Sequence, residues 1–253
     1  RDVDSGQEAS MDYDQLVLAT GTTPVLPPLP GADLPGVFTV SNLHHAQAIK
    51  NKLAQGEIES AVVVGGGAIG LEMAEAFADL WGVETTVVEM MDHVLPAALG
   101  PDTAGLVHKQ LEDNDVRVMC KTKVTGVVGD ADTGVQAVRT SEGDIPCQAV
   151  IFSVGVRPST KLAQDAGLTI GPFGGIAVNA RLRTSDPNIY AGGDCIEQRH
   201  LISGENLIMP LGSLANRQGR VIANNIAGGN DQFPGVIGNF CVKVFDIGVA
   251  RAG

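Results

Sequence analysis

Apolar residues along this chain repeat with two different periods, and the change from one to the other predicts a β-α-β unit. Residues 60–64 contain a run of valines that is typical of a buried strand, and residues 84–89, after a turn at Gly82, are expected to form a second strand. Between them, residues 68–80 carry apolar side chains at helical spacing. A strand, a helix and a second strand in this order predict a β-α-β crossover.

Shorter segments before and after this unit predict further elements. Residues 1–21 are expected to form a hairpin that turns at residues 4–7 and ends in a buried strand. Prolines within residues 22–36 exclude a helix or a sheet interior, so we expect a crossing between domains there. The remaining predicted helices are 42–56, 100–115 with Asp102 as N-cap, 160–167 and 212–229; the remaining strands are 116–120, 124–130, 134–140, 149–155, 175–180, 188–194 and those within 235–253. The four short strands between residues 116 and 155 predict an antiparallel meander.

Three glycines follow the first strand of the β-α-β unit at G-x-G-x-x-G spacing: Gly65, Gly67 and Gly70. In a dinucleotide site such glycines make the turn, let the backbone approach a pyrophosphate and let the helix pack on the strand. Glu89 ends the second strand, where a carboxylate can accept hydrogen bonds from ribose hydroxyls. It would also repel the 2′-phosphate of NADP, so the motif favours NAD. The alternative is a glycine-rich turn that only packs a helix on a strand.

Two similar segments flank this unit, "LVLATGTTP" and "VIFSVGVRP". Each is a strand that ends at a glycine, Gly21 or Gly155, with a proline three residues later. This repetition favours one domain inserted in another, and chance similarity is the alternative. Further along, "TSDPNIYAGGDCIE" ends a strand at Asp194, which could bind ligand hydroxyls or could cap a helix.

Charge and composition exclude several classes of function. A net charge of −12 argues against nucleic-acid or anionic-membrane partners, and no apolar run is long enough to span a membrane. The four cysteines are scattered and favour a reducing, cytoplasmic compartment. The histidines show no metal-ligand spacing, so no metal site is predicted.

Four segments in order resemble the pyridine nucleotide-disulfide oxidoreductases: "ATGTTP", "GGGAIGLE" with Glu89, "VGVRP" and "TSDPNIYAGGDC". "PLGSLANRQGR" and "VKVFDIGVARAG" are most similar to the branch of NADH oxidases and coenzyme A-disulfide or persulfide reductases. The resemblance implies an α/β fold, in which a Rossmann-like dinucleotide-binding domain with an antiparallel meander is inserted in part of a second, FAD-type domain. The implied architecture is three-layer ββα. The implied ranges are 1–32 and 153–233 for the FAD domain, 33–152 for the NAD(H) domain and 234–253 for the start of an interface domain.

The resemblance also implies which residues meet the cofactors. Asp194 would bind the ribityl chain of FAD, and the helix that opens at Gly212 and Ser213 would point at the flavin. Glu72 would support a lysine near the flavin N5. The residues implied at the cofactors are Thr20, Gly21, Gly65, Gly67, Ala68, Ile69, Gly70, Glu72, Glu89, Gly155, Gly193, Asp194, Gly212 and Ser213.

Two family features are absent from this sequence, the N-terminal FAD fingerprint and the redox cysteine, which we expect upstream of Arg1 in a longer protein. The chain is therefore expected to be a fragment that lacks both ends, has no catalytic residue of its own and purifies without flavin colour. The whole protein is expected to be a homodimer.

The implied function is an FAD-dependent oxidoreductase that passes hydride from NADH to flavin and electrons to a disulfide, a persulfide or oxygen. One alternative is a cysteine-free NADH reductase for a ferredoxin- or rubredoxin-like partner. Another, for this chain alone, is a non-catalytic NAD-binding module.

Overall fold

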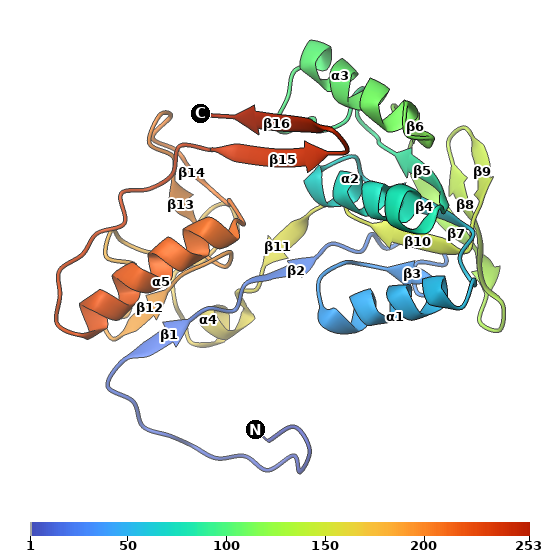
Figure 1. Ribbon diagram of the computed structural model, residues 1–253. Helices are drawn as coiled ribbons and strands as arrows, with labels where there is room; N and C mark the ends of the chain where they lie inside the picture. The colour runs from blue at the N-terminus through green and yellow to red at the C-terminus, as the bar shows by residue number, and fades with distance from the viewer. Residues whose placement is uncertain (1) are drawn as a thin grey trace. The chain divides into compact units, whose positions relative to one another are not determined.

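The computed structural model describes residues 2–253, and the chain divides into two compact units (Figure 1). The outer unit contains the residues up to Thr22 together with Arg157–Ile237. The inserted unit contains Thr23–Val156 and Gly238–Gly253. Both units combine helices with parallel strand pairs, so the predicted α/β class is confirmed. The domain ranges given above stay a prediction.

The inserted unit is built on a five-stranded parallel sheet in the order β3-β10-β4-β5-β6. Its strands are β3 (Val37–Phe38), β4 (Ser60–Val64), β5 (Glu84–Val88), β6 (Val116–Met119) and β10 (Ala149–Phe152). All four residues of β10 are buried, as expected for a strand covered on both faces. The two predicted strands of the β-α-β unit, β4 and β5, pair directly, with Val62 opposite Thr86.

Helices cover one face of this sheet and a β-meander covers the other. The helices are α1 (Leu43–Ala54), α2 (Ala68–Glu75) with its π-helical continuation η1 (Ala76–Leu80), and α3 (Pro101–Glu112); the meander is β7 (Val124–Asp130), β8 (Gly134–Thr140) and β9 (Gly143–Pro146). Because side chains alternate along a strand, Val63 packs in the core with the helices. Its neighbours Val62 and Val64 pack in the core with the meander.

A C-terminal hairpin completes the core on the helical side. It consists of β15 (Phe240–Val244) and β16 (Ile247–Arg251). Val244 and Phe245 are buried in the same cluster as Leu71 of α2. The Phe245 amide also donates a hydrogen bond of 2.8 Å to the Glu75 carboxylate of α2. The hairpin and α2 are thus one packing unit.

For this unit, two predictions are wrong in detail and one strand was missed. The segments 116–120 and 149–155 belong to the parallel sheet, since the strand in each pairs with a parallel neighbour. The third meander strand, β9, was missed because Ile145 is its only buried residue. Asp102 is not the N-cap of α3: Gly100 takes that position because Pro101, which has no N–H, occupies the first turn.

The outer unit pairs β1 (Leu16–Leu18) in parallel with β12 (Ile189–Ala191). Its other elements are α4 (Lys161–Asp165), β13 (Gln198–Arg199), β14 (Asn206–Leu207) and α5 (Gly212–Ile226). The segments that follow Gly21 and Gly155, where the chain passes between the two units, become β2 (Thr22–Pro24) and β11 (Val156–Pro158). A cluster that includes Leu18, Tyr190 and Ile222 forms the core of this unit.

For the outer unit, two predictions are wrong. Residues 2–15 form a turn but no hairpin, because their apolar side chains, Val3 and Met11, have no surface to cover and are exposed. Residues 175–180 form only isolated bridges at Ile176. The Asn179 side chain accepts hydrogen bonds from two following backbone amides, which favours a turn over a continued strand.

Candidate functional site: two cofactor cradles

The glycine loop joins β4 to α2. Gly65 has a φ of +107°, a conformation that side chains disfavour, and a β-carbon there would lie 2.7 Å from the Ser153 carbonyl oxygen. A β-carbon on Gly70 would lie 2.0 Å from the Gly65 carbonyl oxygen, so only glycine fits. At Gly67 a β-carbon would meet nothing within 4 Å. The first and third glycines therefore serve the fold, and the second leaves space beside the backbone for a ligand.

The N-terminus of α2 begins at this open space. Gly67 is the N-cap and supplies no side-chain hydrogen bond, so within residues 2–253 no side chain caps the first-turn amides. Ala68 and Ile69 occupy the first turn, and Ile69 is exposed. Uncapped amides and the positive end of the helix dipole together favour an anionic group such as a pyrophosphate.

Glu89 lies beside the loop, directly after β5, and is only 8 % exposed. One carboxylate oxygen accepts a hydrogen bond from the Gly66 amide at 2.7 Å, and the other accepts one from the Met91 amide at 2.8 Å. A carboxylate has about four acceptor positions, so the oxygens retain capacity for ribose hydroxyls. Glu89 both fixes the glycine loop and keeps acceptors available next to it.

Ser153 is a site residue that sequence reasoning missed. It follows β10, and its hydroxyl lies 3.0 Å from the carbonyl oxygens of both Val64 and Gly65. This hydroxyl therefore holds the start of the glycine loop from the neighbouring strand. A lone serine before Gly155 gives no pattern from which this role could be inferred.

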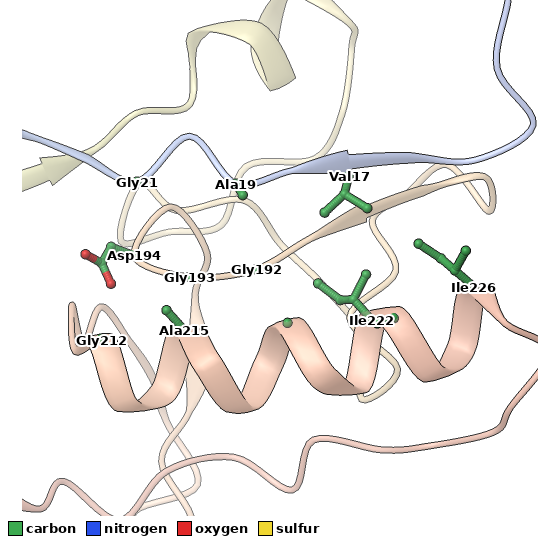
Figure 2. Close-up of a pocket in the computed structure, with 12 residues that line it drawn as sticks. Val17, Ala19, Gly21, Gly192, Gly193, Asp194, Gly212, Ala215, Ile222 and Ile226 are labelled. Atoms are coloured by element: carbon green, nitrogen blue, oxygen red, sulfur yellow. The ribbon is translucent and has the colours of Figure 1, made fainter.

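The outer unit holds a pocket of about 410 Å³ that runs along one face of α5 (Figure 2). Gly21, Gly193, Asp194 and Gly212 line it at the end where α5 begins. Apolar side chains line the remainder, namely Val17, Ile222 and Ile226. The sequence predicts six flavin-side residues in this unit: Thr20, Gly21, Gly193, Asp194, Gly212 and Ser213. Four of these six line the pocket.

The polar end of this pocket combines a carboxylate with a helix N-terminus. Within the part of the chain that the structure describes, no side-chain hydrogen bond is formed to the N-terminus of α5, whose N-cap is Leu211. Asp194 is half-buried, and its desolvation raises the pKa of the carboxyl above its usual range. A carboxylate and uncapped amides that face one pocket suit a ligand with both hydroxyls and an electron-rich ring system.

The raised pKa of Asp194 gives a stability prediction. Because the folded chain binds this proton more tightly than the unfolded chain, the ionised carboxyl costs stability as pH rises through its folded pKa. Asp194→Asn should therefore stabilise the ligand-free chain by roughly 0.5 kcal/mol or less at neutral pH, given solvent screening. Denaturant titrations of both proteins should show the difference vanish in acid; an equal difference at all pH values would contradict this origin.

The remaining predicted residues neither line the pocket of the outer unit nor bond to the glycine loop in the part of the chain that the structure describes. The Thr20 hydroxyl donates to the Ser159 carbonyl at 2.6 Å and so ties the start of β2 to the chain after β11. Ser213 and Gly155 are exposed. Glu72 is exposed on α2, where it borders a second pocket of about 330 Å³ with Glu75 and Lys243.

The cysteines behave as core or surface thiols. Burial raises the pKa of Cys147 to about 12, so this side chain stays protonated. The Cys195 thiol is buried and lies 3.3 Å from the Gly192 carbonyl oxygen, to which it donates. Within residues 2–253, no three histidine, cysteine or acidic side chains gather as a metal site would require. Nor does any helix in that range combine the length and apolarity that crossing a bilayer demands.

The inserted unit thus offers a glycine loop with an acidic partner, and the outer unit a pocket lined by a carboxylate. The family model for pyridine nucleotide-disulphide oxidoreductases matches residues 1–219. The chain belongs to this family, as its sequence motifs predict.

Three similar proteins illustrate the relationship. An "NADH oxidase" of Methanocaldococcus jannaschii is 42 % identical over 98 % of this chain and 54 % of its own length. A crystal structure of an FAD-dependent pyridine nucleotide-disulphide oxidoreductase from Desulfovibrio vulgaris is 43 % identical, with a TM-score of 0.92 over 99 % of this chain and 63 % of the other. An NAD-dependent persulfide reductase from A. fulgidus is 44 % identical, also with a TM-score of 0.92, over 96 % of this chain and 44 % of the other. The chain spans about half the length of the curated relatives that it matches.

Proposed function

We propose that the whole protein is an FAD-dependent oxidoreductase that takes hydride from NADH and delivers electrons to a disulfide or persulfide of the coenzyme A type, or to oxygen. The observation that carries this proposal is the pairing of an uncapped helix N-terminus with Glu89 at the glycine loop. The oxidase and persulfide reductase described above support the choice of acceptors.

In the inserted unit, the residues would hold NADH by its polar parts. The open space beside Gly67 admits the pyrophosphate to the first-turn amides of α2. The free acceptor capacity of Glu89 binds the adenosine ribose, and its charge excludes a 2′-phosphate. Gly155 would lie beside the bound coenzyme, as the family resemblance implies.

In the outer unit, the residues fit a flavin. Asp194 offers acceptors for the ribityl hydroxyls, and the start of α5 at Gly212 and Ser213 directs its positive end toward a ring that becomes electron-rich. Gly21 and Gly193 let a flat ring lie close to the backbone. When bound, FAD supplies the hydride and electron chemistry, while the chain binds and orients it.

The acceptor side of the reaction is proposed on the family resemblance. None of Cys120, Cys147, Cys195 and Cys241 takes the position of the family's redox cysteine, so that group would come from the longer protein. Glu72 would support the flavin from α2 in that protein. We also propose a cytoplasmic location and a homodimer. The ferredoxin or rubredoxin alternative is less well supported, because the similar proteins described above are an oxidase and a persulfide reductase.

For this chain alone, a second function is NAD binding without catalysis. The observation that favours it is that Glu89 and the whole glycine loop lie in the inserted unit, which has its own two hydrophobic clusters. Such a chain would bind NADH and purify without yellow colour. Stoichiometric flavin in the purified chain would contradict this second function.

The test of the main proposal uses two measurements. Calorimetry with the purified chain should detect heat on adding NADH, and the whole protein should lose its visible flavin absorbance when mixed with NADH. A well-folded chain that gives no binding with NADH would contradict the coenzyme assignment. A whole protein whose flavin stays oxidised would contradict the oxidoreductase assignment.

A further inference from the structure

Two buried glutamines form a continuous chain of hydrogen bonds behind the flavin-side pocket. Gln218 of α5 is fully buried, at 0 % exposure, and Gln198 of β13 is 3 % exposed. The Gly193 amide donates to the Gln218 side-chain oxygen at 2.6 Å. The Gln218 side-chain nitrogen donates to the Gln198 oxygen at 3.0 Å, and the Gln198 nitrogen donates to the Met209 carbonyl at 3.0 Å. We call these groups the amide relay.

The two ends of the relay fix its direction. A backbone N–H at Gly193 can only donate, and a backbone carbonyl at Met209 can only accept. Each glutamine must therefore present its oxygen toward Gly193 and its nitrogen toward Met209. Reversing either amide would place two donors or two acceptors in contact inside the core, at the cost of an unsatisfied buried group. Hydrogen bonds aligned in one direction also strengthen each other.

The relay joins the two segments that carry the ligand-facing groups. At one end it holds Gly193, whose φ of +82° directs the chain into Asp194. At the other it holds Met209, two residues before the N-cap of α5 at Leu211. The carboxylate and the helix N-terminus that line the pocket are thus fixed to one another through Gln218 and Gln198.

We propose that Gln218 and Gln198 are positioning residues that set the placement of Asp194 relative to the N-terminus of α5, and through it the affinity of the outer unit for flavin. This inference rests on the proposed function, because flavin is the ligand that the pocket is proposed to hold. Neither glutamine touches the ligand. They act by holding the Gly193 peptide in the orientation that presents Asp194.

A first experiment measures the relay without any ligand. Amide hydrogen exchange of Gly193 should be slow in the native chain, because its N–H is bonded to a buried acceptor. In Gln218→Met, which keeps the length of the side chain but removes the acceptor, Gly193 should exchange at least about tenfold faster. Unchanged exchange at Gly193 would overturn the proposal, whatever the result with flavin.

A second experiment uses the whole protein, freed of its flavin, and measures flavin affinity by following the fluorescence as FAD is added. Loss of the relay in Gln218→Met should weaken FAD binding about tenfold, the scale of one lost buried hydrogen bond. Gln218→Glu should bind equally weakly in alkaline buffer, where a carboxylate opposes the Gln198 oxygen. In acidic buffer it should recover, because a protonated carboxyl accepts from Gly193 and donates to Gln198. A merely structural glutamine would not produce this recovery relative to the native chain.

Asn225 provides the matched control. It is another buried amide on α5, and its side chain bonds to the Arg181 carbonyl and to the backbone of Asp231, away from Gly193. Asn225→Leu should lower the unfolding midpoint but leave Gly193 exchange and FAD affinity within about twofold of the native values. If Asn225→Leu weakens FAD binding as much as Gln218→Met, the relay has no special role. If the whole native protein binds no FAD, the proposed function of the outer unit fails; if it binds FAD and its Gln218→Met variant binds equally tightly, only this inference fails.

Discussion

Replacing Gly70 with alanine is expected to destabilise the chain by about 2–3 kcal/mol, in the range of overpacked core substitutions. The new methyl group would meet the Gly65 carbonyl oxygen at 2.0 Å and the Ser153 hydroxyl oxygen at 2.6 Å. The carbonyl oxygen cannot move without displacing the turn after β4, and rotation of the hydroxyl would break its bonds to the carbonyls of Val64 and Gly65. Urea denaturation of both proteins would measure the loss, and calorimetry should show NADH binding weakened by about tenfold or more as the loop shifts.

Gly67→Ala is the matched control for this prediction. The added methyl group meets nothing within 4 Å, so stability should change by only about 0.5 kcal/mol, the scale of a weaker N-cap. NADH affinity should nevertheless fall, because the methyl group occupies the space that a pyrophosphate needs. Comparable destabilisation by both substitutions would contradict the division between a packing glycine and a ligand-facing glycine.

A second large effect is expected from the pair Glu89→Ala with Met90→Arg. The first change removes the carboxylate that repels a 2′-phosphate, and the second supplies a cation at an exposed position, since Met90 is 63 % exposed. NADH affinity should fall by about tenfold or more, and NADPH should become the preferred coenzyme. Titrating both coenzymes calorimetrically at low ionic strength would measure the change.

Two controls separate coenzyme choice from loop order. Glu84→Ala removes an exposed carboxylate at the other end of β5 and should change neither affinity. Met90→Arg alone keeps the two bonds of Glu89 to Gly66 and Met91, and should leave NADH binding largely intact. Retention of NADH preference by the double variant would show that the carboxylate does not choose the coenzyme.

The parts of the fold that carry regular patterns could be predicted from the sequence. The valines of β4 and β5 and the helical period between these strands gave the β-α-β crossover, because strands buried on both faces are rich in such β-branched residues. The position of Glu89 followed from the same pattern. The residues at the N-terminus were misassigned, because the turn at residues 4–7 leads to a hairpin only when a partner covers side chains such as Met11 and Tyr13, which are exposed.

The supporting residues of the site could not be predicted, because their roles depend on contacts between distant segments. Ser153 lies 88 positions from the Gly65 carbonyl that it bonds. Glutamine is a residue type that is usually exposed on a helix. Only the 0 % exposure of Gln218 in the structure reveals it as part of a buried network. A polar residue on a helix is informative only once its neighbours are known.

The shared core of α2 and the C-terminal hairpin determines how this chain can be dissected. A fragment that stops at Val156 would strip Val242, Val244 and Phe245 from the face of Leu71 and leave an apolar surface exposed to water. To isolate the coenzyme-binding part for crystallisation or as a sensor, residues 23–156 should be fused to residues 238–253 through a linker. The hairpin belongs in that minimal module although 81 residues of the outer unit, Arg157–Ile237, separate it from the rest in sequence.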